Sequence, residues 1–311
     1  MKNNTNIELS IVATVYNDAE IVSLLVKELC HQCEQLKVSY EIILVNDYST
    51  DSSEIEIQKA CKENKNVKGI SLSRNFGQQI AMSAGMRYAS GKYIIIMDGD
   101  LQNPPSAIPS LYKEILKGYD VVYTVSKTRN NFIDKATSRL FYFMLTKIFG
   151  VKIVPNQITM TIMNRTFIDQ YNEYNETVRT VSGIFREVSS HYQVLNVENQ
   201  IRKIGKSHYS FFKRLNLSID MIISLTNYPL NLMIYFGFSI FLLTMLTIIY
   251  YLFTYLFYDV PAGFTSIILT ISFFGSLIVL LLGFIGRYLS NIYTEVRKRP
   301  LFHVKETYNL E

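Results

Sequence analysis

The sequence has no tryptophan, only three cysteines and few charged residues, since Asp, Glu, Lys and Arg make up 18% of its 311 residues. Cys30, Cys33 and Cys61 are too few for the disulfide framework of a small secreted protein. Cys30 and Cys33 have the two-residue gap of a zinc or redox motif, but no second pair follows at ligand spacing, which favours a structural role. A net charge of +5 without any recognition motif argues against a nucleic-acid partner.

Basic residues are missing altogether from a long stretch of the C-terminal third. Between Arg214 and Arg287 lie 72 residues without Lys or Arg, and only two of them are acidic. Two apolar runs, 230–257 and 263–285, fill this stretch, and each exceeds the roughly 20 residues that a helix needs to cross a bilayer. The sequence therefore predicts two membrane-spanning helices and a lipid bilayer as a partner.

The distribution of basic residues predicts the orientation of these two helices. Lys213 and Arg214 precede the first run and Arg287 follows the second, whereas the link between the runs has no basic residue. Positive-inside bias places both termini in the cytoplasm, and the polar start of the chain does not read as a cleavable signal. The richness in Asn, Ile, Lys and Tyr favours a bacterial source, so the predicted location is a bacterial inner membrane. The predicted organisation is a cytosolic domain over 1–210, a juxtamembrane amphipathic helix over 211–229, a two-helix membrane region over 230–286 and a cytosolic tail over 287–311.

The first 125 residues alternate between short apolar runs and helical patterns. The runs are four to seven residues long and cover 9–15, 42–45, 67–72, 93–97 and 121–125. This alternation predicts an α/β fold, a Rossmann-like and mostly parallel sheet with helices on both faces. In such sheets ligands bind beyond the carboxyl ends of the strands, so the polar residues that follow the runs are candidate site residues.

An Asp-x-Asp pair, Asp98 and Asp100, follows directly on the run 93–97. Such a pair alone is usually a solvated turn. At the end of a buried strand, however, two carboxylates one residue apart repel each other, and a divalent cation offsets that repulsion. The position of the pair predicts a cation site, whose coordination shell a diphosphate would complete.

Several segments resemble, in the same order, the signatures of a known family. They are Leu9–Asn17 (LSIVATVYN), Val45–Asp51 (VNDYSTD), Ser71–Gly77 (SLSRNFG) and Met97–Pro105 (MDGDLQNPP). They are similar to those of family-2 glycosyltransferases with the GT-A fold. The resemblance runs over nearly the whole chain and includes Arg202–Tyr209 (RKIGKSHY) and Glu295–Pro300 (EVRKRP). It points to polyprenyl-phosphate glycosyltransferases of the dolichol-phosphate mannose synthase type, in particular the bacterial members with two C-terminal membrane helices.

This resemblance implies a function and a set of site residues. The function would be the transfer of one sugar from a nucleotide-sugar donor to a polyprenyl phosphate, undecaprenyl or dolichyl phosphate, at the cytosolic membrane face, with Mg²⁺ or Mn²⁺ and with inversion. Asp98 and Asp100, helped by Gln102, would hold the metal against the donor diphosphate. Asp100 would also be a catalytic residue. The residues expected at the nucleotide are Tyr16, Asn17, Asp47 and Arg74. Those expected to face the acceptor phosphate and the transferred sugar are Arg129, Arg202 and Ser207.

The sequence departs from the family at 159 and 161, where many relatives carry an acidic residue and an arginine and this chain has Thr159 and Thr161. Smaller departures are Thr14 in place of a proline, and Asn46-Asp47-Tyr48 in place of Asp-Asp-Gly. A hydroxyl acceptor would need a carboxylate base near the attacking oxygen. A lipid phosphate needs none, because its second pKa of about 6 leaves it mostly dianionic at neutral pH. The substitution is therefore compatible with a phosphate acceptor.

Two other functions remain open from the sequence. One is a non-processive membrane-bound transferase that acts on a lipid-linked saccharide; a processive synthase is disfavoured because its Gln-x-x-Arg-Trp signature needs a tryptophan. The other is a catalytically silent scaffold, against which the intact acidic pair argues. Gly275, Gly283 and Gly286 offer close-packing points through which the membrane helices could form a homo-oligomer.

Overall fold

A computed structural model describes the chain over residues 7–126, 154, 156–174, 181–197, 235–240, 242–243, 246, 249–250, 253, 257, 263–297 and 299–310. The chain divides into two compact units. The first consists of Met1–Phe143, Lys152–Phe211 and Arg299–Glu311, and the second of Met144–Val151 and Phe212–Lys298.

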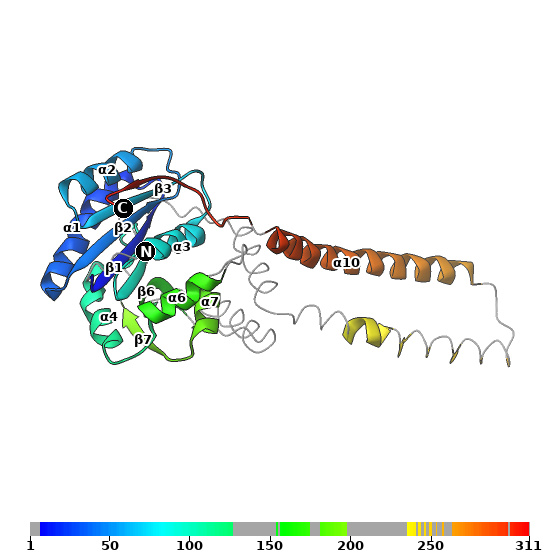
Figure 1. The fold of residues 1–311 in the computed structure, drawn as a ribbon. Helices are drawn as coiled ribbons and strands as arrows, with labels where there is room; N and C mark the ends of the chain where they lie inside the picture. The colour runs from blue at the N-terminus through cyan, green and yellow to red at the C-terminus, as the bar shows by residue number, and fades with distance from the viewer. Residues whose placement is uncertain are drawn as a thin grey trace. The chain divides into compact units, whose positions relative to one another are not determined.

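The first unit is built on one eight-stranded sheet (Figure 1) with the order β7-β5-β6-β4-β1-β2-β3-β8. The central strands β3, β2, β1 and β4 run parallel, and β6 and β8 join them antiparallel on either side. All five predicted strands are present, and the predicted mostly parallel α/β sheet is confirmed. The strand bounds are β1 Leu9–Val15, β2 Tyr40–Asn46, β3 Val67–Leu72, β4 Tyr93–Asp98, β5 Val121–Ser126, β6 Gln157–Asn164, β7 Tyr192–Val197 and β8 Val304–Tyr308.

Helices cover both faces of this sheet because its strands are apolar on both sides. Along β2, Ile42 and Leu44 pack into one core cluster with α1, α2 and α4, whereas Ile43 and Val45 pack into a second cluster with α3, α6 and α7. Figure 1 shows these two helical layers on opposite sides of the strands. This two-sided burial is typical of parallel sheets. The helix bounds are α1 Ala19–Leu36, α2 Ser53–Glu63, α3 Gln78–Tyr88, α4 Ile108–Ile115, α6 Arg165–Glu173 and α7 Val181–Val188, with a 3₁₀ turn at Pro105–Ala107 before α4.

The C-terminal segment forms a strand of the sheet, where the sequence analysis expected only a tail. β8 pairs antiparallel with β3, from Gly69 opposite Tyr308 to Leu72 opposite Val304. The ring of Tyr308 covers Gly69, because a Cβ added at Gly69 would lie 2.7 Å from Tyr308 Cδ2. The Tyr308 hydroxyl accepts a hydrogen bond from Gln58 Nε2 at 2.9 Å. Residues 299–310 thus belong to the same unit as the N-terminal sheet.

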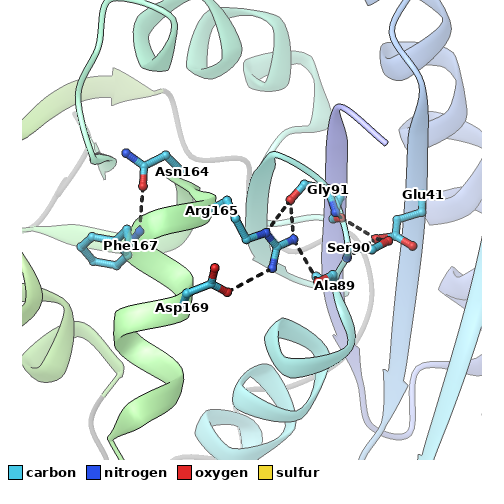
Figure 2. Close-up of polar contacts among 9 residues, drawn as sticks. Glu41, Ala89, Ser90, Gly91, Asn164, Arg165, Phe167 and Asp169 are labelled. Atoms are coloured by element: carbon cyan, nitrogen blue, oxygen red, sulfur yellow. Dashed lines mark hydrogen bonds and ion pairs between the residues drawn. The ribbon is translucent and has the colours of Figure 1, made fainter. Parts of the chain in front are cut away.

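Arg165 at the start of α6 fixes the turn that leads into β4, the strand that carries the acidic pair. Its guanidinium donates to the carbonyl oxygens of Ala89, at 3.0 Å, and Gly91, at 3.0 Å from Nε (Figure 2). Ser90, between them, donates to Glu41 from its backbone N at 2.7 Å and from its hydroxyl at 2.8 Å. A side chain from α6 and one from β2 therefore hold the entry to β4 from two directions.

The second unit contains the long helix α10, Phe264–Val296, which includes most of the second predicted membrane-spanning run. Among the residues that the structure describes, no helix is both long and apolar enough to cross a membrane. The two predicted membrane-spanning helices are thus not supported by the structure. Most of the first apolar run and all of the predicted juxtamembrane helix at 211–229 lie outside the described residues.

Replacing Tyr308 tests whether β8 contributes to the stability of the sheet. We expect Tyr308→Ala to lower the free energy of unfolding by about 1–3 kcal/mol, because it removes a half-buried ring from Gly69 together with its hydrogen bonds. Tyr308→Phe keeps the ring and should lose less than half as much. Denaturant unfolding of the full chain measures both values, and an alanine variant as stable as the wild type would show that β8 is not part of the stable sheet.

The surroundings of Glu41 predict how the free energy of unfolding changes as the pH falls. Only 1% of Glu41 is exposed. Burial alone would raise its pKa, but the ion pair with Lys68, at 2.6 Å, and hydrogen bonds from Ser10 and Ser90 outweigh burial and hold the pKa below 4.5. Because the folded-state pKa lies below the ordinary value, ionised Glu41 stabilises the fold above pH 4.5, and this contribution is lost as the pH falls through the folded-state pKa.

We therefore expect Glu41→Gln to cost about 1–3 kcal/mol at neutral pH and to flatten the loss of stability below pH 4.5. Unfolding free energies measured from pH 3 to pH 7 check this, with the exposed Glu20→Gln on α1 as a control that should keep the wild-type slope. A Glu41→Gln variant with the wild-type slope would contradict the assignment.

Candidate functional site

The loops at the carboxyl ends of β1, β2 and β4 share an unusual backbone conformation. Each contains one non-glycine residue with positive φ: Asn17 at 55°, Tyr48 at 61° and Leu101 at 58°. This left-handed region is uncommon for residues with a Cβ, and strained backbone of this kind is concentrated at functional sites. The three loops lie at the sheet edge where the sequence predicted the site, because β1 is paired in parallel with both β2 and β4.

Asp98, the last residue of β4, is surrounded by neutral hydrogen-bond donors. Its Oδ1 accepts from Gln78 Nε2 at the start of α3, and its Oδ2 accepts from Asn103 Nδ2 at 3.1 Å. The side chain of Thr159 on β6 also hydrogen-bonds to Asp98. Burial and, second, the negative charge of Asp100 raise the pKa of Asp98 to about 6, against the effect of these three hydrogen bonds.

Asp100 lies in the tight turn that follows β4. Its Oδ1 accepts from the backbone N of Gln102 at 3.0 Å. The turn passes close to β1, because Gly99 N donates to Thr14 O at 3.0 Å and a Cβ at Gly99 would lie 2.5 Å from that oxygen. Only a glycine allows this approach, which brings both carboxylates of the pair to the end of β1.

A divalent cation fits the chemistry of this pair. Hard oxygen ligands suit Mg²⁺ and Mn²⁺, and the positive charge of a cation would offset both the burial and the repulsion that raise the pKa of Asp98. Within the described part of the chain, no group of three or more His, Cys, Asp or Glu side chains could hold a metal ion. Asp98 and Asp100 would be two ligands of such an ion, and a bound anion or water would fill its other positions.

Asp47 follows β2 and binds backbone rather than solvent. Only 3% of the residue is exposed. Its carboxylate accepts from Phe76 N at 2.7 Å and from Gly77 N at 2.8 Å, so it fixes the loop between β3 and α3. Burial raises the pKa of Asp47, and the two backbone hydrogen bonds act against that rise. The family resemblance places Asp47 at the nucleotide, and the structure adds a role in positioning this loop.

The remaining predicted nucleotide residues lie on the same loops. Tyr16 and Asn17 follow β1, and both are exposed. Arg74 lies in the loop that Asp47 holds, with its guanidinium carbon 4.6 Å from the centre of the Phe76 ring. The predicted acceptor-side residues Arg129, Arg202 and Ser207 lie outside the described residues, so their positions stay a prediction.

Sequence reasoning missed the three side chains that bind Asp98. Gln78, Asn103 and Thr159 come from a helix, a loop and an antiparallel strand, and their sequence spacing gives no signal that they meet. The register does explain Thr159. Ile96 on β4 pairs with Thr161 on β6, so Asp98, two residues further on, faces Thr159. The departure from the family at 159 therefore adjoins the acidic pair.

Two variants test how much burial adds to the contribution of a carboxylate that accepts two backbone hydrogen bonds. We expect Asp47→Asn to cost about 1–3 kcal/mol of stability, because its NH₂ group would face one of two buried N–H donors. The control is Asp51→Asn: this exposed carboxylate also accepts two backbone N–H bonds, from Ser53 at 2.9 Å and Ala19 at 3.1 Å. In thermal unfolding, Asp47→Asn should have a clearly lower melting temperature than Asp51→Asn. Equal losses of melting temperature would count against the role of burial.

Comparison with known proteins identifies relatives that are named as glycosyltransferases. The sequence model of Glycosyl transferase family 2 matches residues 10–195. A protein of Synechocystis sp. named as an uncharacterized glycosyltransferase is 34% identical over 309 residues, covering 98% of this chain and 97% of the relative. The undecaprenyl-phosphate 4-deoxy-4-formamido-L-arabinose transferase of Proteus mirabilis is 33% identical over 308 residues, covering 96% and 93%. Among solved structures, glucosyl-3-phosphoglycerate synthase from Mycobacterium tuberculosis is 16% identical, with a TM-score of 0.49 and coverage of 70% and 78%. The chain therefore belongs to Glycosyl transferase family 2 and is a glycosyltransferase.

Proposed function

We propose that this glycosyltransferase moves a single sugar from a nucleotide-sugar donor to a polyprenyl phosphate at the cytosolic face of a bacterial inner membrane. The reaction uses Mg²⁺ or Mn²⁺ and inverts the anomeric centre. Undecaprenyl phosphate is the favoured acceptor, because several relatives that are 32–33% identical are named undecaprenyl-phosphate 4-deoxy-4-formamido-L-arabinose transferases.

The observation that carries this proposal is the neutral Thr159 hydrogen-bonded to Asp98. An acceptor hydroxyl would have to lose its proton to a nearby base during attack. Thr159 cannot serve as that base, whereas an acceptor phosphate arrives already ionised and nucleophilic. The site chemistry thus favours a phosphate acceptor over the hydroxyl of a lipid-linked saccharide.

The acidic pair has the role of holding the donor. Asp98 and Asp100 bind the metal, which when present stabilises the negative charge that develops on the leaving nucleoside diphosphate. Gln78, Asn103 and Thr159 fix the orientation of Asp98. Arg129, Arg202 and Ser207 face the acceptor phosphate in this proposal and hold it for attack.

Membrane association follows from the chemistry of the acceptor and from the composition of the C-terminal third. A polyprenyl tail stays in lipid, so the catalytic unit has to work at its surface. On α10, large apolar side chains are exposed, among them Ile271 at 67%, Leu282 at 59% and Leu289 at 62%. Exposed apolar surface of this extent marks a contact with lipid or protein, and we assign it to the bilayer.

The test is transfer of labelled sugar from a panel of nucleotide sugars into undecaprenyl or dolichyl phosphate by the full chain with Mn²⁺ or Mg²⁺. We expect a lipid product from one donor, loss of at least about a hundredfold in rate with Asp100→Ala, and little change with Glu63→Gln, an exposed carboxylate at the end of α2. Labelled product with a saccharide acceptor but none with either lipid phosphate would contradict the proposed acceptor.

A further inference from the structure

Tyr48 has a backbone conformation that is costly for its residue type. Its φ of 61° lies in the left-handed region, which glycine adopts freely and which for a bulky residue is an outlier. Its side chain is not buried to compensate, because 48% of the residue is exposed. Neither the packing of the core nor the local backbone therefore accounts for a tyrosine here.

The loop that carries Tyr48 is locked from both sides. Asn46 Oδ1 accepts from Ser49 N at 2.9 Å, and Ser49 Oγ accepts from Asn17 N at 3.0 Å. In return, Asn17 Oδ1 accepts from Thr50 N at 2.8 Å. The loops after β1 and β2 thus fix each other, and they hold Tyr48 in its strained conformation.

A second exposed aromatic residue, Tyr16, directly follows the neighbouring strand β1 and is 45% exposed. The parallel register ends with Val15 opposite Asn46, and Asp47 N donates to Val15 O at 3.1 Å. The residues that follow β1 and β2 therefore start at the same level of the sheet. Two exposed tyrosines therefore follow adjacent strand ends, at the sheet edge that also carries the acidic pair.

We propose that Tyr48 is a binding residue for the nucleobase of the donor, with its ring against the face of the base on the Tyr16 side of the site. An exposed aromatic ring offers a flat surface on which a nucleobase can stack, and stacking of a base on an aromatic side chain tolerates any base. The inference rests on the proposed nucleotide-sugar donor and adds a residue that would set its affinity.

Three substitutions distinguish the contribution of the Tyr48 ring from the effect of its strained backbone. Tyr48→Gly removes the ring and relieves the strain at φ, Tyr48→Asn removes the ring but tolerates left-handed φ, and Tyr48→Phe keeps the ring and removes the hydroxyl. Calorimetry with UDP, GDP and CDP in the presence of Mn²⁺ measures nucleotide binding to the full chain. Inorganic pyrophosphate with Mn²⁺ serves as a probe that lacks a base.

We expect the Gly and Asn variants to bind the preferred nucleoside diphosphate about 5- to 100-fold more weakly, with pyrophosphate binding unchanged and thermal stability at least that of the wild type. The Phe variant should bind within about twofold of the wild type, since it retains the stacking face. Unchanged nucleotide affinity in the Gly and Asn variants would overturn the inference, as would an equal loss of affinity for pyrophosphate. A wild-type chain that binds no nucleoside diphosphate with Mn²⁺ or Mg²⁺ would instead overturn the proposed function itself.

Discussion

The structure depends most on the burial of one carboxylate, Asp98, beside a second, Asp100. Burying one acidic group at the end of an apolar strand, close to a second, is unfavourable, and burial and then the charge of Asp100 raise the pKa of Asp98 to about 6. Three neutral side chains from different elements offset part of this cost by hydrogen bonds. The burial of Asp98 and the repulsion by Asp100 act against these hydrogen bonds, and a divalent cation is a ligand that would offset both.

The elements around this carboxylate are themselves held by buried polar groups. Arg165 and Glu41 fix the entry to β4, and Asp47 fixes the loop between β3 and α3 through two backbone N–H groups. β8 pairs with β3 at the edge of the sheet. Just before β8, His303 O accepts a hydrogen bond at 2.9 Å from Ser73 N, at the start of the loop between β3 and α3. The C-terminal residues thus support the loop that carries Arg74, although α10 separates them from it in sequence.

The sequence predicted the parts of the fold that depend on local pattern. Five apolar runs became strands within two residues of their predicted ends, because continuous burial on both faces leaves an unambiguous apolar run. β8 was missed because the edge strand Val304–Tyr308 is short and contains Lys305 and Glu306, so it lacks a continuous apolar run. The family was predicted correctly from the motifs, whereas the two membrane-spanning helices were not supported by the structure.

For the site, the sequence indicated which residues follow the strands but not what they touch. Asp47 shows the limit, since its position after β2 was correct and its two backbone partners, about thirty residues away, were not foreseeable. Thr159 was noticed as a departure from the family, and only the antiparallel register of β4 and β6 reveals that it faces Asp98. Long-range pairing decides such contacts, and the local pattern of a sequence does not reveal which strands pair.

The central claim is that Asp98 and Asp100 together bind a divalent cation that grips a diphosphate. The most direct measurement is anomalous X-ray scattering from crystals grown with Mn²⁺ and a nucleoside diphosphate. We expect a manganese peak within coordination distance of a carboxylate oxygen of the pair and of the diphosphate. A diphosphate bound at the ends of β1 and β4 with no manganese between it and these two residues would contradict it.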